Sequence, residues 1–321
     1  MSLGNLLNID REKGLFFKSH DLALSYAEQA EMSRLSPAGG LDYAPNTNPF
    51  SVLTTGNGSS RENAMPFANI NGFKIYYEQH GEGETVILLH HGFGCTKMWK
   101  DIWPALTAAG YRVVLYDRRG YGRSEQGFDF PEFYVSDRFR SESVRELDAL
   151  RTMLSLDSFH LIGQCEGGVI AADYTFSNPP SVISVSMSST QCYSTVTMAE
   201  FNAAKMPNPF SDLGQGLREK LAVWHGPDRV EAFYDQFRTY GGAYGTGVFD
   251  LRRELSAISC PVLVLYPDRS FLFPVEQGVA MYRSLAKAEL AVLPNCGHNT
   301  YEEQPEAYTR IVLDFLRRRQ S

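Results

Sequence analysis

Residues 161–168 read Leu-Ile-Gly-Gln-Cys-Glu-Gly-Gly, and this stretch decides the fold. Its first residues continue an apolar run that is typical of a buried strand, and residues 167–177 have the pattern of a helix. A strand, a tight glycine turn and a helix form a nucleophile elbow, which exposes its central side chain above a sheet. That central residue is Cys165. We expect the positive end of the following helix to lower the pKa of its thiol.

Strands and helices alternate on both sides of this turn. Helical stretches such as 141–155 separate most of the apolar runs, and Asn71-Gly72 is a strong hairpin signal between the first two. The predicted strands cover residues 67–70, 74–80, 85–90, 112–117, 159–163, 182–188, 261–266 and 289–293. Strands that are apolar on both faces and alternate with helices predict an α/β fold with a doubly wound, mostly parallel sheet.

Two segments depart from this alternation. Residues 1–64 are predicted to form a partly helical, loop-rich N-terminal extension, and residues 65–189 and 260–321 form the core. Residues 190–259 are longer than one crossover requires and are rich in aromatic residues, with helical pieces and no convincing strand. We expect a helical cap over the carboxyl ends of the strands. Ligands bind at that edge, so Tyr193 and Trp224 of the cap, together with Ser270 of the core, are candidates to line a pocket.

Composition limits the partners of this protein. A net charge of −7 argues against nucleic acid and anionic membranes, and no apolar run reaches the roughly 18 residues of a membrane span. The N-terminal residues lack the apolar run of a signal peptide, and five cysteines without CxxC spacing favour reduced thiols in the cytoplasm. No cluster has metal-ligand spacing, and Gly92-Phe93-Gly94 lacks the third glycine of a dinucleotide site. We therefore expect no cofactor, a small apolar or aromatic substrate, and a homodimer as the candidate assembly.

Two further motifs complete a candidate catalytic centre. His298 follows the last predicted strand and comes after Cys165 in the chain, the position and order expected of a catalytic base. The loop His91-Gly92-Phe93-Gly94 follows the strand 85–90. Backbone N–H groups of Phe93 and Glu166 are the candidates for an oxyanion hole, with the Glu166 side chain turned away. We read His91 as structural, at the edge of the pocket.

The chain from about Met65 to its end resembles the α/β-hydrolase superfamily. The motifs that carry this resemblance are the loop 91–94, the run Asp117-Arg-Arg-Gly-Tyr-Gly-Arg-Ser124, the elbow and the pair Gly297-His298. The cysteine in Gly-x-Cys-x-Gly-Gly is similar to that of dienelactone hydrolases, and the large cap resembles the esterase, lactonase and C–C hydrolase branch. The resemblance implies hydrolysis of an ester, thioester, lactone or C–C bond by a Cys165 nucleophile and a His298 base. A lyase or acyltransferase is the alternative, and a small-molecule sensor is a third.

The acid of the triad departs from the pattern of the superfamily. When Pro261 and Pro274 are aligned with the usual motif, Ser270 occupies the position of the usual aspartate. Three alternatives remain: Asp268 reaches His298 from two residues earlier, an acid elsewhere serves, or Cys165 and His298 act as a dyad. A thiol needs less help from its base than a hydroxyl does, so a cysteine nucleophile is consistent with a weakened acid position.

Overall fold

The computed structural model describes residues 67–239 and 241–319 of the chain. The predicted N-terminal extension, residues 1–64, lies outside the described residues. No helix among the described residues is both long and apolar enough to cross a membrane.

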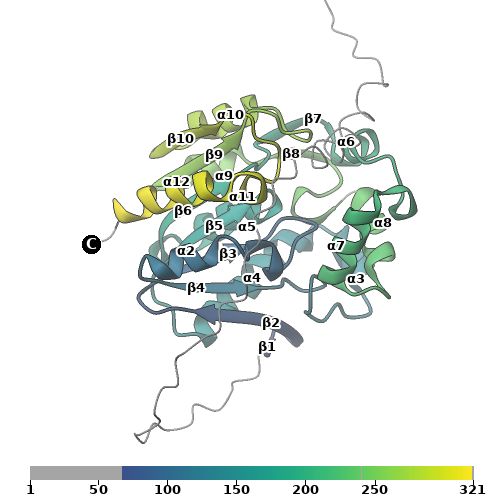
Figure 1. Ribbon diagram of the computed structural model, residues 1–321, viewed down its shortest axis with the longest axis horizontal. Coiled ribbons are helices and arrows are strands. Elements are labelled where there is room, and N and C mark those ends of the chain that lie inside the picture. The colour runs from purple at the N-terminus through teal and green to yellow at the C-terminus, as the bar shows by residue number, and fades with distance from the viewer. Residues whose placement is uncertain (1–66, 240, 320–321) are drawn as a thin grey trace, which may run out of the picture. The chain divides into compact units, whose positions relative to one another are not determined.

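Eight strands form one central sheet in the order β1-β2-β4-β3-β5-β6-β9-β10 (Figure 1). Both β1 and β2 are antiparallel to their neighbours, and all the other pairs are parallel. The strands are β1 (Phe67–Ile70), β2 (Phe73–His80), β3 (Glu84–Leu89), β4 (Tyr111–Tyr116), β5 (Phe159–Gln164), β6 (Val182–Ser188), β9 (Val262–Pro267) and β10 (Ala288–Leu293). The predicted hairpin is confirmed, since Asn71 and Gly72 both have positive φ angles, 51° and 89°.

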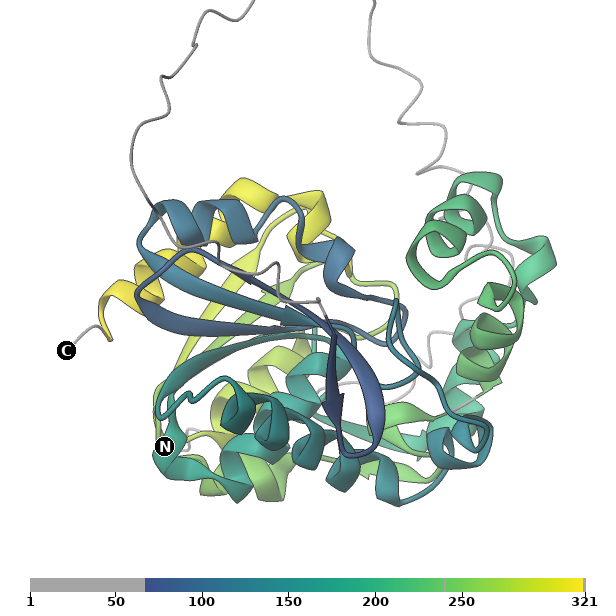
Figure 2. The same ribbon diagram turned by 90° about the horizontal axis from the view of Figure 1, so that it is seen from below.

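Helices cover both faces of this sheet, as Figure 2 shows. The helices are α2 (Trp103–Ala108), α3 (Phe130–Tyr134), α4 (Arg138–Met153), α5 (Glu166–Ser177), α6 (Met198–Lys205), α7 (Gln215–His225), α8 (Val230–Thr239), α9 (Arg252–Ala257), α10 (Glu276–Ser284), α11 (Thr300–Glu303) and α12 (Pro305–Arg317). Within β3, Ile87 and Leu89 pack in a core with residues of α4 and α5, while Val86 and Leu88 pack in a second core with residues of α2 and α12. Alternate side chains of one strand thus enter opposite cores, as a doubly wound sheet requires.

Residues 190–259 form an insertion between β6 and β9. It holds α6 to α9 together with β7 (Tyr193–Thr197), β8 (Val248–Asp250) and the 3-10 turns η3 (Phe210–Asp212) and η4 (Gly242–Tyr244). The expectation of no strand here is wrong, because β7 and β8 pair as a small antiparallel sheet. These strands are short and far apart in sequence, and β7 is half-exposed, so a local pattern gives little signal for them.

Candidate active site

The turn after β5 has the geometry that its sequence predicts. Cys165 stands between β5 and α5 with φ 51° and ψ −114°, a conformation that costs a non-glycine residue about 1–3 kcal/mol. Glycines on both sides make the turn sterically feasible. A Cβ on Gly163 would lie 2.4 Å from the Gly167 carbonyl oxygen, and one on Gly167 would lie 2.2 Å from that of Leu89.

The Cys165 thiol is buried at the carboxyl end of β5, with 7% of the residue exposed. Its Sγ lies 3.6 Å from the Tyr244 hydroxyl, and the backbone N–H of Glu166 donates toward it. Burial raises the pKa of the thiol to about 12 and outweighs these two donors. The helix end does lower this pKa, through the Glu166 N–H, but removal from water outweighs that effect, so the expected net lowering is not found.

His298 is brought beside the elbow through its backbone. Its carbonyl oxygen accepts hydrogen bonds from Gln164 Nε2 and from Ser189 Oγ, each at 2.8 Å. The imidazole is buried and contacts the rings of Phe271 and Phe273 edge-on, with centroid distances of 5.7 and 5.5 Å. Burial lowers the pKa of His298 to about 3, so the ring is neutral at pH 7. No hydrogen bond joins the thiol and the imidazole in the described part of the chain.

Ser270, and not Asp268, is the partner of the His298 ring. Ser270 Oγ lies 3.0 Å from His298 Nδ1, the place where an aspartate stands in a conventional triad. The same Oγ accepts N–H groups from Leu272 at 3.3 Å and Phe273 at 3.1 Å, which leaves its hydrogen to donate toward Nδ1. The serine thus favours the neutral ring with its hydrogen on Nε2, and it offers no charge to stabilise an imidazolium.

Asp268 has a different place in the structure. Its exposed carboxylate accepts the N–H of Cys296 at 3.0 Å, and backbone hydrogen bonds from Asn295 and Cys296 lower its pKa. No ion pair or hydrogen bond links Asp268 to His298 within residues 67–239 and 241–319. The alternative in which Asp268 reaches the imidazole is therefore not the arrangement found. The two-residue offset directs this side chain to the loop that carries His298 instead of to the ring.

The two predicted oxyanion donors are not equivalent. Glu166 directs its N–H toward the thiol, whereas Phe93 donates its N–H to His91 Nδ1 at 3.1 Å. On its other side, His91 Nε2 lies 3.0 Å from the Tyr301 hydroxyl. His91 thus holds the loop 91–94, in agreement with a structural role. In this conformation the N–H of Phe93 is engaged within its own loop.

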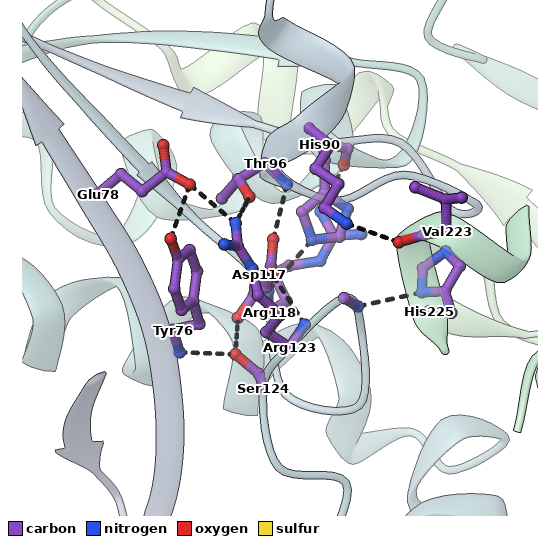
Figure 3. Close-up of polar contacts among 12 residues, drawn as sticks. Tyr76, Glu78, His90, Thr96, Asp117, Arg118, Arg123, Ser124, Val223 and His225 are labelled. Carbon is purple, nitrogen blue, oxygen red and sulfur yellow. Dashed lines mark hydrogen bonds and ion pairs between the residues drawn. The ribbon is translucent and has the colours of Figure 1, made fainter. Parts of the chain in front are cut away.

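The insertion is tied to the loop 91–94 and to the turn after β4, and Figure 3 shows the second of these links, from His225, next to the residues around Asp117. His225, at the end of α7, accepts the Gly122 N–H at its Nδ1 (3.0 Å) and donates from Nε2 to the Phe93 carbonyl oxygen (2.8 Å). In the same view, the buried Asp117 carboxylate accepts the N–H groups of Thr96 and Arg123. These bonds order the two loops that border the carboxyl ends of β3 and β4.

The two predicted pocket aromatics lie in different surroundings. The ring of Trp224 in α7 lies 6.1 Å from that of His91, next to the loop 91–94. Tyr193 lies in β7, where the Arg252 guanidinium stands 4.9 Å above its ring and its backbone N–H donates to Gln277. Of these two residues, Trp224 thus lies beside the candidate site.

Sequence reasoning missed a buried amide that links the two catalytic candidates. Gln164, next to Cys165, donates to the His298 carbonyl and accepts from Ser188 Oγ at 2.5 Å and Thr300 Oγ1 at 3.1 Å. The sequence signal that could have identified Gln164 was a polar residue at the carboxyl end of an otherwise apolar strand. Among residues 67–239 and 241–319, no group of three or more His, Cys, Asp or Glu side chains is arranged to hold a metal ion.

A buried ion pair lies under the elbow. The Glu166 side chain turns away from the thiol, as expected, and accepts Arg118 Nη2 at 2.5 Å and the Tyr121 hydroxyl at 3.0 Å. Arg118 also donates to the His90 carbonyl oxygen at 2.6 Å. Both charged side chains are almost fully excluded from solvent.

Arg118→Met is expected to destabilise the protein by about 3–5 kcal/mol, because it leaves the Glu166 carboxylate buried without its partner. Urea unfolding followed by circular dichroism measures this change. Arg145→Met, which removes an exposed pair with Glu142 in α4, is the control and should unfold near the wild-type midpoint. An Arg118 variant as stable as that control would show that the buried pair with Glu166 is not needed for stability.

Comparison with known proteins places this geometry in a family. The model of the alpha/beta hydrolase family matches residues 86–311. The chain belongs to the alpha/beta hydrolase family. The predicted fold class is confirmed, and the chain is a hydrolase of this fold.

Relatives of this alpha/beta hydrolase include enzymes with several substrates. The 2-hydroxy-6-oxo-6-phenylhexa-2,4-dienoate hydrolase of Comamonas testosteroni is 25% identical over 298 residues, which cover 83% of this chain and 99% of the relative. The proline iminopeptidase of Lactobacillus helveticus is 25% identical over 293 residues, covering 79% and 97%.

Two solved structures share the fold. The meta-cleavage product hydrolase of Pseudomonas fluorescens IP01 has a TM-score of 0.64 and 19% identity, covering 79% of this chain and 98% of that chain. The enol-lactonase of Burkholderia xenovorans LB400 has a TM-score of 0.60 and 21% identity, covering 78% and 100%.

Proposed function

We propose that this protein is a cofactor-free hydrolase in which Cys165 is the nucleophile and His298 moves the protons. The observation that carries the proposal is the strained Cys165 turn, with the Glu166 N–H directed at the sulfur and His298 held beside it through Gln164. The substrate is an ester, thioester or lactone of a small apolar or aromatic molecule, or a ketone whose C–C bond is cleaved. The dienoate hydrolase and the enol-lactonase among the relatives of this protein support the C–C and the lactone class, respectively.

The proposed reaction proceeds through a thioester. His298 Nε2 takes the thiol proton while Cys165 Sγ bonds to the carbonyl carbon, and the carbonyl oxygen becomes an oxyanion. The intermediate collapses, the bond to the leaving group breaks, and His298 gives the proton to that group. Water then gives a proton to His298 and attacks the thioester, which releases the acid and restores the thiol. The reaction therefore starts from the tautomer in which Nε2 is unprotonated and Nδ1–H faces Ser270 Oγ, and not from the Nε2–H tautomer that Ser270 favours at rest.

The burial of the site supports a cap function for the insertion. Cys165 and His298 are 7% and 6% exposed, and α7 is bonded to the loops beside them. Exclusion of water also favours a second candidate, an acyltransferase, because the thioester would survive until another acceptor arrives. Five free cysteines support the expectation of a reducing, cytoplasmic location, and a homodimer stays the candidate assembly.

Labelling of the thiol tests this proposal. Iodoacetamide should add one carbamidomethyl group to Cys165, located by mass spectrometry of intact and digested protein. Because the pKa of the thiol is raised to about 12, the labelling rate should rise about tenfold per pH unit from about pH 6 to about pH 9. A resting thiolate–imidazolium pair would instead give a rate independent of pH in this range.

Product analysis in isotopically labelled water separates the candidate reactions. The probes are p-nitrophenyl butyrate, dihydrocoumarin and 2-hydroxy-6-oxo-6-phenylhexa-2,4-dienoate. Hydrolysis places the heavy oxygen in the acid product, whereas acyl transfer to an added alcohol does not. A protein that neither turns over a probe nor labels at Cys165 would contradict the proposed function and favour a binding protein.

A further inference from the structure

Tyr244 reaches the candidate nucleophile from the insertion. Its hydroxyl oxygen lies 3.6 Å from Cys165 Sγ, within hydrogen-bond range for sulfur. The same oxygen accepts the backbone N–H of Gln191 at 3.3 Å. With a lone pair occupied by that N–H, the hydroxyl hydrogen is left to donate, and the sulfur is its acceptor.

The turn that carries Tyr244 is fixed by the buried ion pair under the elbow. The N–H of Ala243 donates to Glu166 Oε2 at 3.4 Å. A Cβ on Gly242 would lie 2.1 Å from the same oxygen, so η4 sits directly on the carboxylate. The carboxylate is held in turn by Arg118. The phenol is thus placed by the fold before any substrate arrives.

Aromatic packing holds the ring itself. The Phe249 ring meets the Tyr244 ring edge-on at 4.9 Å, and the Phe273 ring lies at 5.8 Å. Burial raises the pKa of Tyr244 well above its ordinary value, with the neighbouring Cys165 as the next cause. The phenol therefore keeps its proton at neutral pH and acts as a hydrogen-bond donor, not as a base.

The Tyr244 hydroxyl supplies a second hydrogen-bond donor for an oxyanion, which the loop 91–94 does not offer in this conformation. The Phe93 N–H is engaged by His91 at 3.1 Å, so of the two predicted oxyanion donors Glu166 is the one that directs its backbone N–H at the thiol. One donor stabilises an oxyanion poorly, since acyl-transfer enzymes place at least two where the charge develops. When Sγ bonds to a carbonyl carbon, the oxyanion develops next to the sulfur. It is then within reach of the Tyr244 hydroxyl, which is already hydrogen-bonded to Sγ.

We propose that Tyr244 is a catalytic residue that donates its hydroxyl hydrogen to Cys165 Sγ at rest and to the carbonyl oxygen in the tetrahedral intermediate. It stabilises first the thiolate and then the oxyanion, beside the N–H of Glu166. The proton stays on Tyr244 throughout, so no group is consumed. This role rests on the proposed function of Cys165 as the nucleophile.

Tyr244→Phe tests the proposal, because it removes the hydroxyl and keeps the ring. The rate of Cys165 alkylation by iodoacetamide should fall about threefold to tenfold at each pH, since the thiolate loses a donor. On whichever probe the wild type hydrolyses, kcat should fall about 100-fold while KM changes little, as for the loss of one oxyanion donor. The control is Tyr266→Phe, which removes a nearby hydroxyl that donates to the Thr190 carbonyl oxygen at 2.9 Å.

The outcomes separate the two proposals. A Tyr244 variant with the alkylation rates and kcat of the wild type overturns the role of Tyr244 and leaves that of Cys165 intact. An equal loss in the Tyr266 variant would likewise overturn it, by showing a general effect of losing a hydroxyl. If no probe is turned over, the alkylation rates alone decide. If Cys165 of the wild type resists alkylation at all pH values, the proposed function itself fails.

Discussion

Cys165→Ser is expected to lower kcat/KM by about 1000-fold or more on any probe that the wild type hydrolyses. A serine hydroxyl is far less acidic than a thiol and depends on a strong base to lose its proton. The base here has a pKa lowered to about 3, and its Nδ1 faces Ser270 instead of a carboxylate. In serine proteases, loss of the correct partner at Nδ1 costs about 10⁴-fold in kcat. We therefore expect the serine variant to be nearly as inactive as Cys165→Ala.

Steady-state kinetics of purified variants measure this loss. Cys260→Ser changes a half-buried cysteine just before β9 and should keep wild-type activity. Equal urea midpoints of all variants exclude unfolding as the cause. A serine variant with more than about a tenth of the wild-type activity would show that this site does not depend on a thiol. An active alanine variant would remove Cys165 from the reaction.

The predictable part of this molecule lies in short-range patterns. The stretch Leu161 to Gly168 predicted the strand, the turn and the helix, because a buried apolar run followed by closely spaced glycines is compatible with few other structures. The hairpin at Asn71-Gly72 was equally local. The alternation of strands and helices then led to the doubly wound sheet, since parallel strands need crossovers on both faces.

The incorrect predictions concern contacts between residues that are far apart in the sequence. The pKa of Cys165 depends on burial under an insertion that begins about 25 residues later, and a helix-end argument omits that burial. Tyr244 was one aromatic among many, and only the folded chain shows that η4 sits on Glu166. The offset of Asp268 was visible in the sequence, but the direction of its side chain was not.

Ser270→Asp is expected to restore activity to the serine variant. In the Cys165→Ser background it should raise kcat/KM by about 100-fold, because a carboxylate at Nδ1 stabilises the imidazolium and selects the tautomer with Nε2 free. The local backbone accepts this change, since aspartate retains acceptors for the N–H groups of Leu272 and Phe273. In the Cys165 background, the same substitution should speed alkylation at pH 7 by about tenfold through a raised pKa of His298.

Ser270→Asn is the matched control, because it has nearly the size of aspartate but carries no charge, and it should give no gain in either background. Kinetics of the two single variants and the double variant form a thermodynamic cycle. The expected result is strong coupling, in which aspartate at position 270 matters far more to a serine nucleophile than to a cysteine. Simple additivity in well-folded variants would contradict this link. The physical reason for coupling is that both positions act on one proton, and the more acidic thiol releases it to a weaker base.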